Sequence, residues 1–83
     1  MSEVFIARKP FKGSSAKEIP LDGQEMVSLT LFNDSNSEVT FKAGVFEFTV
    51  AANDAFDERI DPFTKLEITA ASGSYRGYCR IRA

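Results

Sequence analysis

The chain has 83 residues, of which 43% are hydrophobic and 27% are charged, and its formal net charge at pH 7 is -2. This length has room for one domain, and eight Phe residues are typical of a packed core rather than of a disordered segment. The chain has no His and one cysteine, Cys79, so an internal disulfide is excluded, the commonest metal ligand is missing, and we expect no cofactor.

The first part of the chain, residues 1–24, is predicted to be an N-terminal arm. Residues 4–7 have the composition of a short strand, but residues 8–22 contain Pro10, Pro20, a glycine and a pair of serines. Such a composition is typical of an extended arm or a long loop. We therefore expect the folded domain to comprise residues 25–83.

Residues 25–50 predict a three-stranded meander. In residues 25–32 apolar and polar side chains alternate, as in a half-buried strand. A polar run of turn formers, residues 33–37, leads into a second strand at 38–42, and Ala43 and Gly44 form a tight turn before a third strand at 45–50. The pattern predicts that Phe46, Phe48 and Val50 share one face.

Residues 51–62 interrupt the alternation, and we expect a long loop there. Phe56 and Ile60 are four residues apart, which is compatible with one helical turn, and Pro62 ends the segment. Strands resume at 64–70 and 75–82, and the turn signal at 71–74 predicts that they form a second hairpin. In the last strand Tyr75, Gly77, Cys79 and Ile81 are on one face, and Arg76, Tyr78, Arg80 and Arg82 are on the other.

Five or six short strands of this kind predict an all-β domain, a small antiparallel β-sandwich with an extended N-terminal arm. A partly open barrel of five or six strands is the alternative. The predicted core consists of Leu29, Leu31, Phe41, Phe46, Phe48, Leu66 and Ile68.

Candidate chemical sites favour binding over catalysis. Without His the chain lacks the usual base for nucleophilic catalysis, and Cys79 alternates with Ile81 on the apolar face, as an inert core cysteine would. The acids of the irregular segment do not have the spacing of a calcium-binding loop, and we interpret them as a solvated loop or a docking surface for a basic partner; they are Asp54, Asp57, Glu58 and Asp61. We expect that the protein is not an enzyme.

Charge is segregated along the chain, with +3 in residues 1–17, -8 in residues 18–67 and +3 in residues 68–83. Basic ends and an acidic middle suit a protein that joins copies of itself or binds other protein subunits, although an ordinary solvated surface explains the pattern too. Arg and Tyr are frequent at interface hot spots. The predicted interface residues are Arg8, Lys9, Lys12, Lys17, Arg76, Tyr78, Arg80 and Arg82.

A second class of function stays open for the same residues. On a barrel of the OB type, Arg76, Tyr78, Arg80 and Arg82 would form a platform for single-stranded nucleic acid. The sequence pI of about 5.0 opposes nonspecific binding to nucleic acid. We also expect no membrane association, because no apolar run approaches the roughly 18 to 20 residues that span a bilayer, and residues 1–10 lack the pattern of a signal peptide.

Three features together make the chain similar to a class of viral proteins: the arm at 3–17, the meander at 27–50 and the closing hairpin at 61–83. In these features it resembles the small β-rich accessory proteins of bacteriophage virions, such as decoration, head-completion or head-to-tail joining subunits. The resemblance implies a non-enzymatic subunit that is made in the host cytoplasm and arrayed in many copies in the virion. Its arm and sheet edges would then bind neighbouring copies, capsid subunits or connector subunits.

Overall fold

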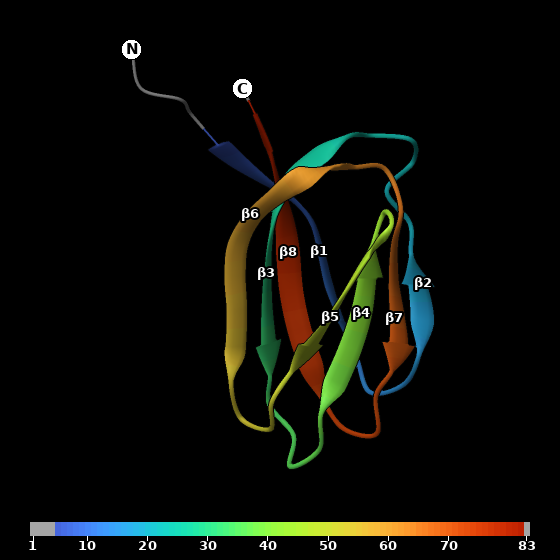
Figure 1. The fold of residues 1–83 in the computed structure, drawn as a ribbon, viewed down its shortest axis with the longest axis vertical. Helices are drawn as coiled ribbons and strands as arrows, with labels where there is room; N and C mark the ends of the chain where they lie inside the picture. The colour runs from blue at the N-terminus through green and yellow to red at the C-terminus, as the bar shows by residue number, and fades with distance from the viewer. Residues whose placement is uncertain (1–4, 83) are drawn as a thin grey trace.

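The computed structural model describes residues 5–82, which form two antiparallel β-sheets packed face to face (Figure 1). Within this range every regular element is a β-strand. The strands are β1 (Phe5–Gly13), β2 (Lys17–Ile19), β3 (Met26–Asn33), β4 (Val39–Ala43), β5 (Phe46–Val50), β6 (Ala55–Phe63), β7 (Leu66–Ala70) and β8 (Tyr75–Arg82). The predicted all-β sandwich is confirmed.

Each sheet has four strands. Sheet A has the order β1-β8-β3-β6, and sheet B has the order β2-β7-β4-β5. The core lies between the sheets and is filled by side chains from alternate positions of the strands. The outer faces of both sheets are therefore left for polar residues and for contacts with other molecules.

The hairpins that the sequence predicts are only partly present. Strands β4 and β5 form the expected hairpin, with Phe41 opposite Phe48. Strands β3 and β4, however, belong to different sheets, and so do β7 and β8, so the two predicted turns at 33–37 and 71–74 cross from one sheet to the other. Turn formers permit either connection, because the choice depends on what the turn packs against.

Asn33 explains the crossing between β3 and β4. Its side chain is 1% exposed. Its Nδ2 donates hydrogen bonds to the carbonyl oxygens of Ser37, Val50 and Ala51, at 2.7, 3.1 and 3.1 Å, while its Oδ1 accepts bonds from the backbone N–H and the hydroxyl of Ser35. One buried amide thus joins the end of a strand in sheet A to the end of β5 in sheet B.

The segment predicted to be an arm differs from the expectation. Val4 and the residues before it lie outside the described range, but β1 pairs with β8 from Phe5 to Gly13, and β2 pairs with β7. Without these partners β7 and β8 would be edge strands, each with unpaired backbone groups along one side. The short strand predicted at 4–7 covers only the start of β1, because the alternation is broken between Arg8 and Phe11, where the register shifts and Lys9 has a φ of 55°.

Residues 51–62 also differ from the predicted loop. Strand β6 pairs along β3 at the edge of sheet A, where Pro62 is tolerated. Phe56 and Ile60 are partly buried and pack against the core. Residues four apart share a face in a strand as well as in a helix, so their spacing could not distinguish the two.

The predicted core is confirmed at five positions and wrong at one. Leu29, Leu31, Phe41, Leu66 and Ile68 are fully buried. Phe48 is partly buried, with its ring centroid 5.4 Å from that of Phe41 and 5.0 Å from that of Phe56. Phe46 is 45% exposed, because it begins an edge strand and no further strand covers it.

Candidate functional site

Strand β8 separates its side chains between the core and the outer face of sheet A, as its alternation predicts. Tyr75 and Cys79 are buried, at 1% and 0% exposure. Burial raises the pKa of the Cys79 thiol to about 12, so this thiol is protonated and shielded from solvent. Arg76, Tyr78, Arg80 and Arg82 therefore lie on the outer face, and the residues that surround them define what this face can bind.

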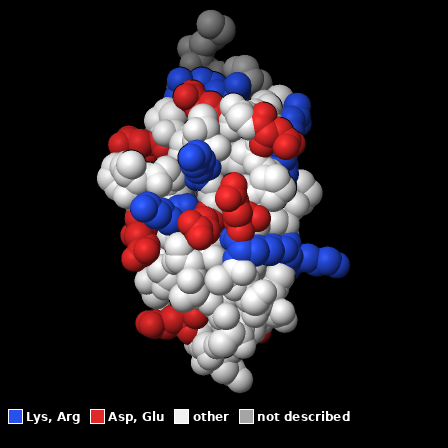
Figure 2. Space-filling model, turned by 90° about the vertical axis from the view of Figure 1, so that its right-hand side faces the viewer, with Lys and Arg blue, Asp and Glu red and all other residues white. Residues whose placement is uncertain are grey.

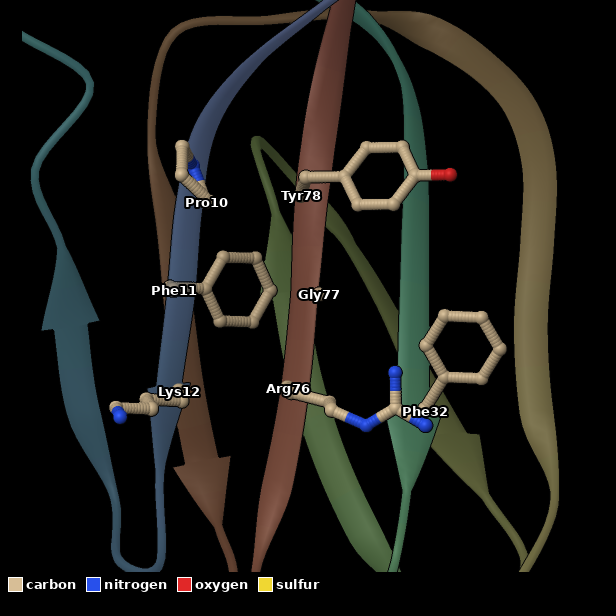
Figure 3. Close-up of a pocket in the computed structure, with 7 residues that line it drawn as sticks. All are labelled: Pro10, Phe11, Lys12, Phe32, Arg76, Gly77 and Tyr78. Carbon is tan, nitrogen blue, oxygen red and sulfur yellow. The ribbon is translucent and has the colours of Figure 1, made fainter.

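A groove of about 420 Å³ crosses the outer face of sheet A (Figure 3). Three strands line it: β1 with Pro10, Phe11 and Lys12, β8 with Arg76, Gly77 and Tyr78, and β3 with Phe32. Its size falls within the range of about 300 to 1,000 Å³ that is usual for ligand pockets. Three aromatic residues and a proline make its lining largely apolar, and two cations lie at its rim.

Gly77 forms the floor of the groove, and only glycine fits there. The ring of Phe11 extends from β1 toward Gly77 in the middle of the groove (Figure 3). A Cβ atom at position 77 would clash with the carbonyl oxygen of Thr30, and it would lie 2.9 Å from the ring of Phe11 and 3.0 Å from the Cα of Leu31. The missing side chain therefore lets the Phe11 ring and the neighbouring strand approach β8 closely.

The cation Arg76 is held in place at the rim of the groove. Its Cζ lies 4.4 Å from the centroid of the Phe32 ring, and its Nε donates a hydrogen bond of 2.9 Å to Oδ2 of Asp34. Its side chain is still 59% exposed. Lys12 lies opposite Arg76 on the neighbouring strand β1 and is exposed as well. Two positive charges therefore face solvent beside the apolar lining.

Arg80 is engaged within the domain. Its Nη1 lies 3.0 Å from Oδ1 of Asp57, which also accepts a 2.9 Å hydrogen bond from the hydroxyl of Thr30. These bonds hold the pKa of Asp57 below its usual value. The Nη2 of Arg80 donates to the hydroxyl of Tyr78 at 3.2 Å. Arg80 thus positions the tyrosine that lines the groove.

The remaining predicted interface residues lie outside the groove. Nζ of Lys9 pairs with Oδ2 of Asp22 at 2.6 Å, and Nζ of Lys17 donates to the carbonyl oxygen of Lys12 at 2.7 Å. Arg8 and Arg82 are exposed on β1 and β8. Figure 2 faces the side of the molecule where β2 lies and shows Lys and Arg interspersed with Asp and Glu. Basic side chains therefore do not form one continuous patch on this side.

A row of mainly acidic side chains crosses the outer face of sheet B, in contrast to the cations at the groove on sheet A. The register of the strands sets exposed charged residues side by side in the order Glu18, Glu67, Lys42 and Glu47. Three acids accompany one base in this row. The two outer faces of the sandwich thus differ in charge, with cations at the groove on sheet A and mainly acids on sheet B.

The acids predicted to form a loop lie on β6 or in the turn before it. Asp54, Asp57, Glu58 and Asp61 are all exposed, and Asp57 is the one that pairs with Arg80. Within residues 5–82, no three His, Cys, Asp or Glu side chains are close enough together to hold a metal ion. The same range contains no helix with the length and apolar character needed to span a membrane.

Sequence reasoning missed Pro10, Phe11, Phe32 and Gly77, which contribute most of the apolar lining. One signal was present for Phe32, because alternation places it on the same face as Ser28 and Thr30. A large aromatic residue on the polar face of a strand is a candidate for binding. Phe11 gave no comparable signal, since it lies in the segment predicted to be an arm.

Comparisons with protein-family models, with curated proteins and with solved structures found no match to this chain.

Proposed function

We propose that this chain is a non-enzymatic structural protein that acts by protein contacts within a multi-subunit assembly. The observation that carries the proposal is the groove on sheet A, where an apolar lining lies beside the exposed cations Lys12 and Arg76. Protein interfaces combine an apolar centre with a polar rim in this way, and Tyr and Arg are frequent at their hot spots. The burial of Cys79, the only thiol, also supports a role without covalent chemistry.

The difference in charge between the two outer faces supports contacts between copies. Lys12 and Arg76 lie on sheet A, whereas Glu18, Glu47 and Glu67 lie on sheet B. A contact between two different faces is heterologous, and repeating it produces rings or filaments rather than closed dimers. Oppositely charged faces also raise the rate of encounter and disfavour contacts between like faces.

The size of the domain supports the same proposal. A single core in a chain of 83 residues contributes little stability beyond what folding needs, so contacts with neighbours would stabilise the folded state through mass action. A virion accessory subunit, the role that the resemblance to bacteriophage proteins implies, is the specific form of this proposal. Its location would then be the virion, and its partners would be copies of itself and capsid or connector subunits.

Sedimentation equilibrium over a range of protein and salt concentrations tests the proposal. We expect the average mass to rise with protein concentration at about 0.1 M salt and to fall at about 1 M salt, where the Debye length shrinks from about 10 Å to about 3 Å. A chain that stays monomeric at every concentration and at low salt would contradict assembly through its own faces.

Binding of single-stranded nucleic acid is a second candidate function, and the aromatic lining of the groove is the observation that favours it. Phe11, Phe32 and Tyr78 offer rings on which bases could stack, beside Lys12 and Arg76 for the phosphates. Fluorescence anisotropy with a labelled oligothymidylate tests this function. We expect no saturable binding at about 0.15 M salt, because the net charge of -2 repels a polyanion. Tight binding that weakens steeply with salt would favour this second function.

A further inference from the structure

The tip of the hairpin between β4 and β5 is the most exposed apolar feature of the described residues. Gly44 turns the chain there with a φ of 62°. The two residues that follow are Val45, which is 82% exposed, and Phe46, which is 45% exposed. Among residues 5–82, these two are the large hydrophobic residues whose side chains are classed as exposed. Exposed apolar side chains that adjoin each other are a common mark of a contact site. Glu47 follows them directly in the chain.

The tip and the groove lie on different layers of the sandwich. The hairpin belongs to sheet B, whereas the groove opens on the outer face of sheet A (Figures 1 and 3). The tip of one copy therefore cannot fill its own groove. Each copy carries an exposed apolar turn and a groove in different places, which is the arrangement that a heterologous contact requires.

We infer that the tip of one copy, residues 44–47, docks into the groove of a second copy. The inference rests on the proposed function, and it names the occupant of the groove. Val45 and Phe46 would bury their apolar surface against Phe11, Phe32 and Tyr78, and aromatic rings gain further from edge-to-face packing.

Charge complementarity supports this occupant. Glu47 directly follows the apolar tip in the chain and is exposed, and Lys12 and Arg76 carry their charges at the rim of the groove. Docking thus brings an acid to two bases. A single tip in a single groove buries less area than the roughly 1,200 Å² of a stable interface, so the contact is weak, and association is measured at protein concentrations high enough for the parent to assemble.

Two variants test the two sides of the contact, the tip and the groove, one at a time. Val45→Ser with Phe46→Ser removes the apolar tip, and Lys12→Glu reverses a charge at the groove. We expect each variant to associate at least about tenfold more weakly than the parent in sedimentation velocity. Arg8→Glu is the matched control. Arg8 is one of the predicted interface residues but lies on the same strand outside the groove, so the same change of charge there should leave association like that of the parent if the groove is the contact.

Mixing the two variants is the decisive experiment. The tip variant keeps its groove and the Lys12→Glu variant keeps its tip, so an equal mixture retains one intact contact and should form a 1:1 dimer and nothing larger. A mixture that stays monomeric, or variants that associate as strongly as the parent, would overturn the tip-and-groove contact. If the variants associate as strongly as the parent, the parent still assembles and the proposed function stands. If the parent itself is monomeric, both the tip-and-groove contact and the proposed function are refuted.

Folding and the competing ligand are checked separately. Melting curves of both variants should resemble that of the parent, since the changed side chains are exposed. If the double change at the tip unfolds the domain, the single variant Val45→Ser replaces it in the association measurements. Association of this variant at the strength of the parent would overturn the inference. Binding of a labelled oligothymidylate that is lost in Lys12→Glu and retained in the tip variant would assign the groove to nucleic acid and overturn it too.

Discussion

The ring of Phe11 on β1 lies against the position on β8 where a side chain at Gly77 would have to be. This relationship couples the edge strand to the centre of sheet A, because a larger residue at 77 would push against both neighbouring strands. The same relationship creates the groove, whose floor is the bare backbone of Gly77. Phe11 and Gly77, which are 66 positions apart in the chain, thus meet in the lining of the groove.

Gly77→Ala should lower the free energy of unfolding by about 1 to 3 kcal/mol, the usual cost of inserting a methyl group into a packed site. The added Cβ would meet the carbonyl oxygen of Thr30, which is backbone and cannot move aside easily. Urea denaturation measures the change. Unchanged stability would mean that β1 and β3 do not approach β8 as described.

Asn33→Ala should lower the free energy of unfolding by about 1 to 3 kcal/mol, because carbonyl groups that accept hydrogen bonds from Asn33 would lose their donor. The carbonyl oxygens of Val50 and Ala51 each accept a bond from Asn33. Asn36→Ala is the matched control: Asn36 belongs to the same turn, but it is exposed, and its change should stay within about 0.5 kcal/mol. Equal effects of the two variants in urea denaturation would show that Asn33 does not join the sheets.

Phe48→Ala and Phe46→Ala form a matched pair on strand β5. Phe48 packs against Phe41 and Phe56, so its truncation should cost about 3 kcal/mol, the lower end of the range for buried Phe. Phe46 is 45% exposed, and its truncation should cost less than about 1 kcal/mol. Thermal melting distinguishes them. The opposite order would show that the hairpin packs in a shifted register.

The ion pair between Asp57 and Arg80 should make a small contribution to stability that depends on pH. The pKa of Asp57 is lowered in the folded state, so the contribution is fully present above the ordinary carboxyl value of 3.8 and is lost as the pH falls through the lower folded value. The pair is partly exposed, which limits it to at most about 1 kcal/mol.

Asp57→Asn tests this pH dependence. The difference in urea midpoint between the parent and Asp57→Asn should be present at pH 7 and should shrink when both are measured below pH 3.8. A difference of the same size at both pH values would mean that the carboxylate of Asp57 is not stabilised by Arg80. Nuclear magnetic resonance titration of Asp57 gives the direction of the pKa shift independently.

The sequence by itself predicted the features that depend on neighbours in the chain. Alternation identified β3, β4, β5, β7 and β8 to within a few residues, and it separated Cys79 on the inner face of β8 from Arg76 on the outer face. The turn at Gly44 correctly predicted the hairpin of β4 and β5. Such features follow from local sterics and from burial of one face, which leave a period of two in the sequence.

Only the tertiary structure decided which sheet each strand joins and where the groove lies. The crossing after β3 depends on hydrogen bonds from Asn33 to residues near position 50, and the pairing of β1 depends on the free edge of β8. The groove needs Phe11, Phe32 and Gly77 side by side, although they are far apart in the chain. These arrangements are stabilised by contacts between distant residues, and a single sequence carries no periodic signal for such contacts.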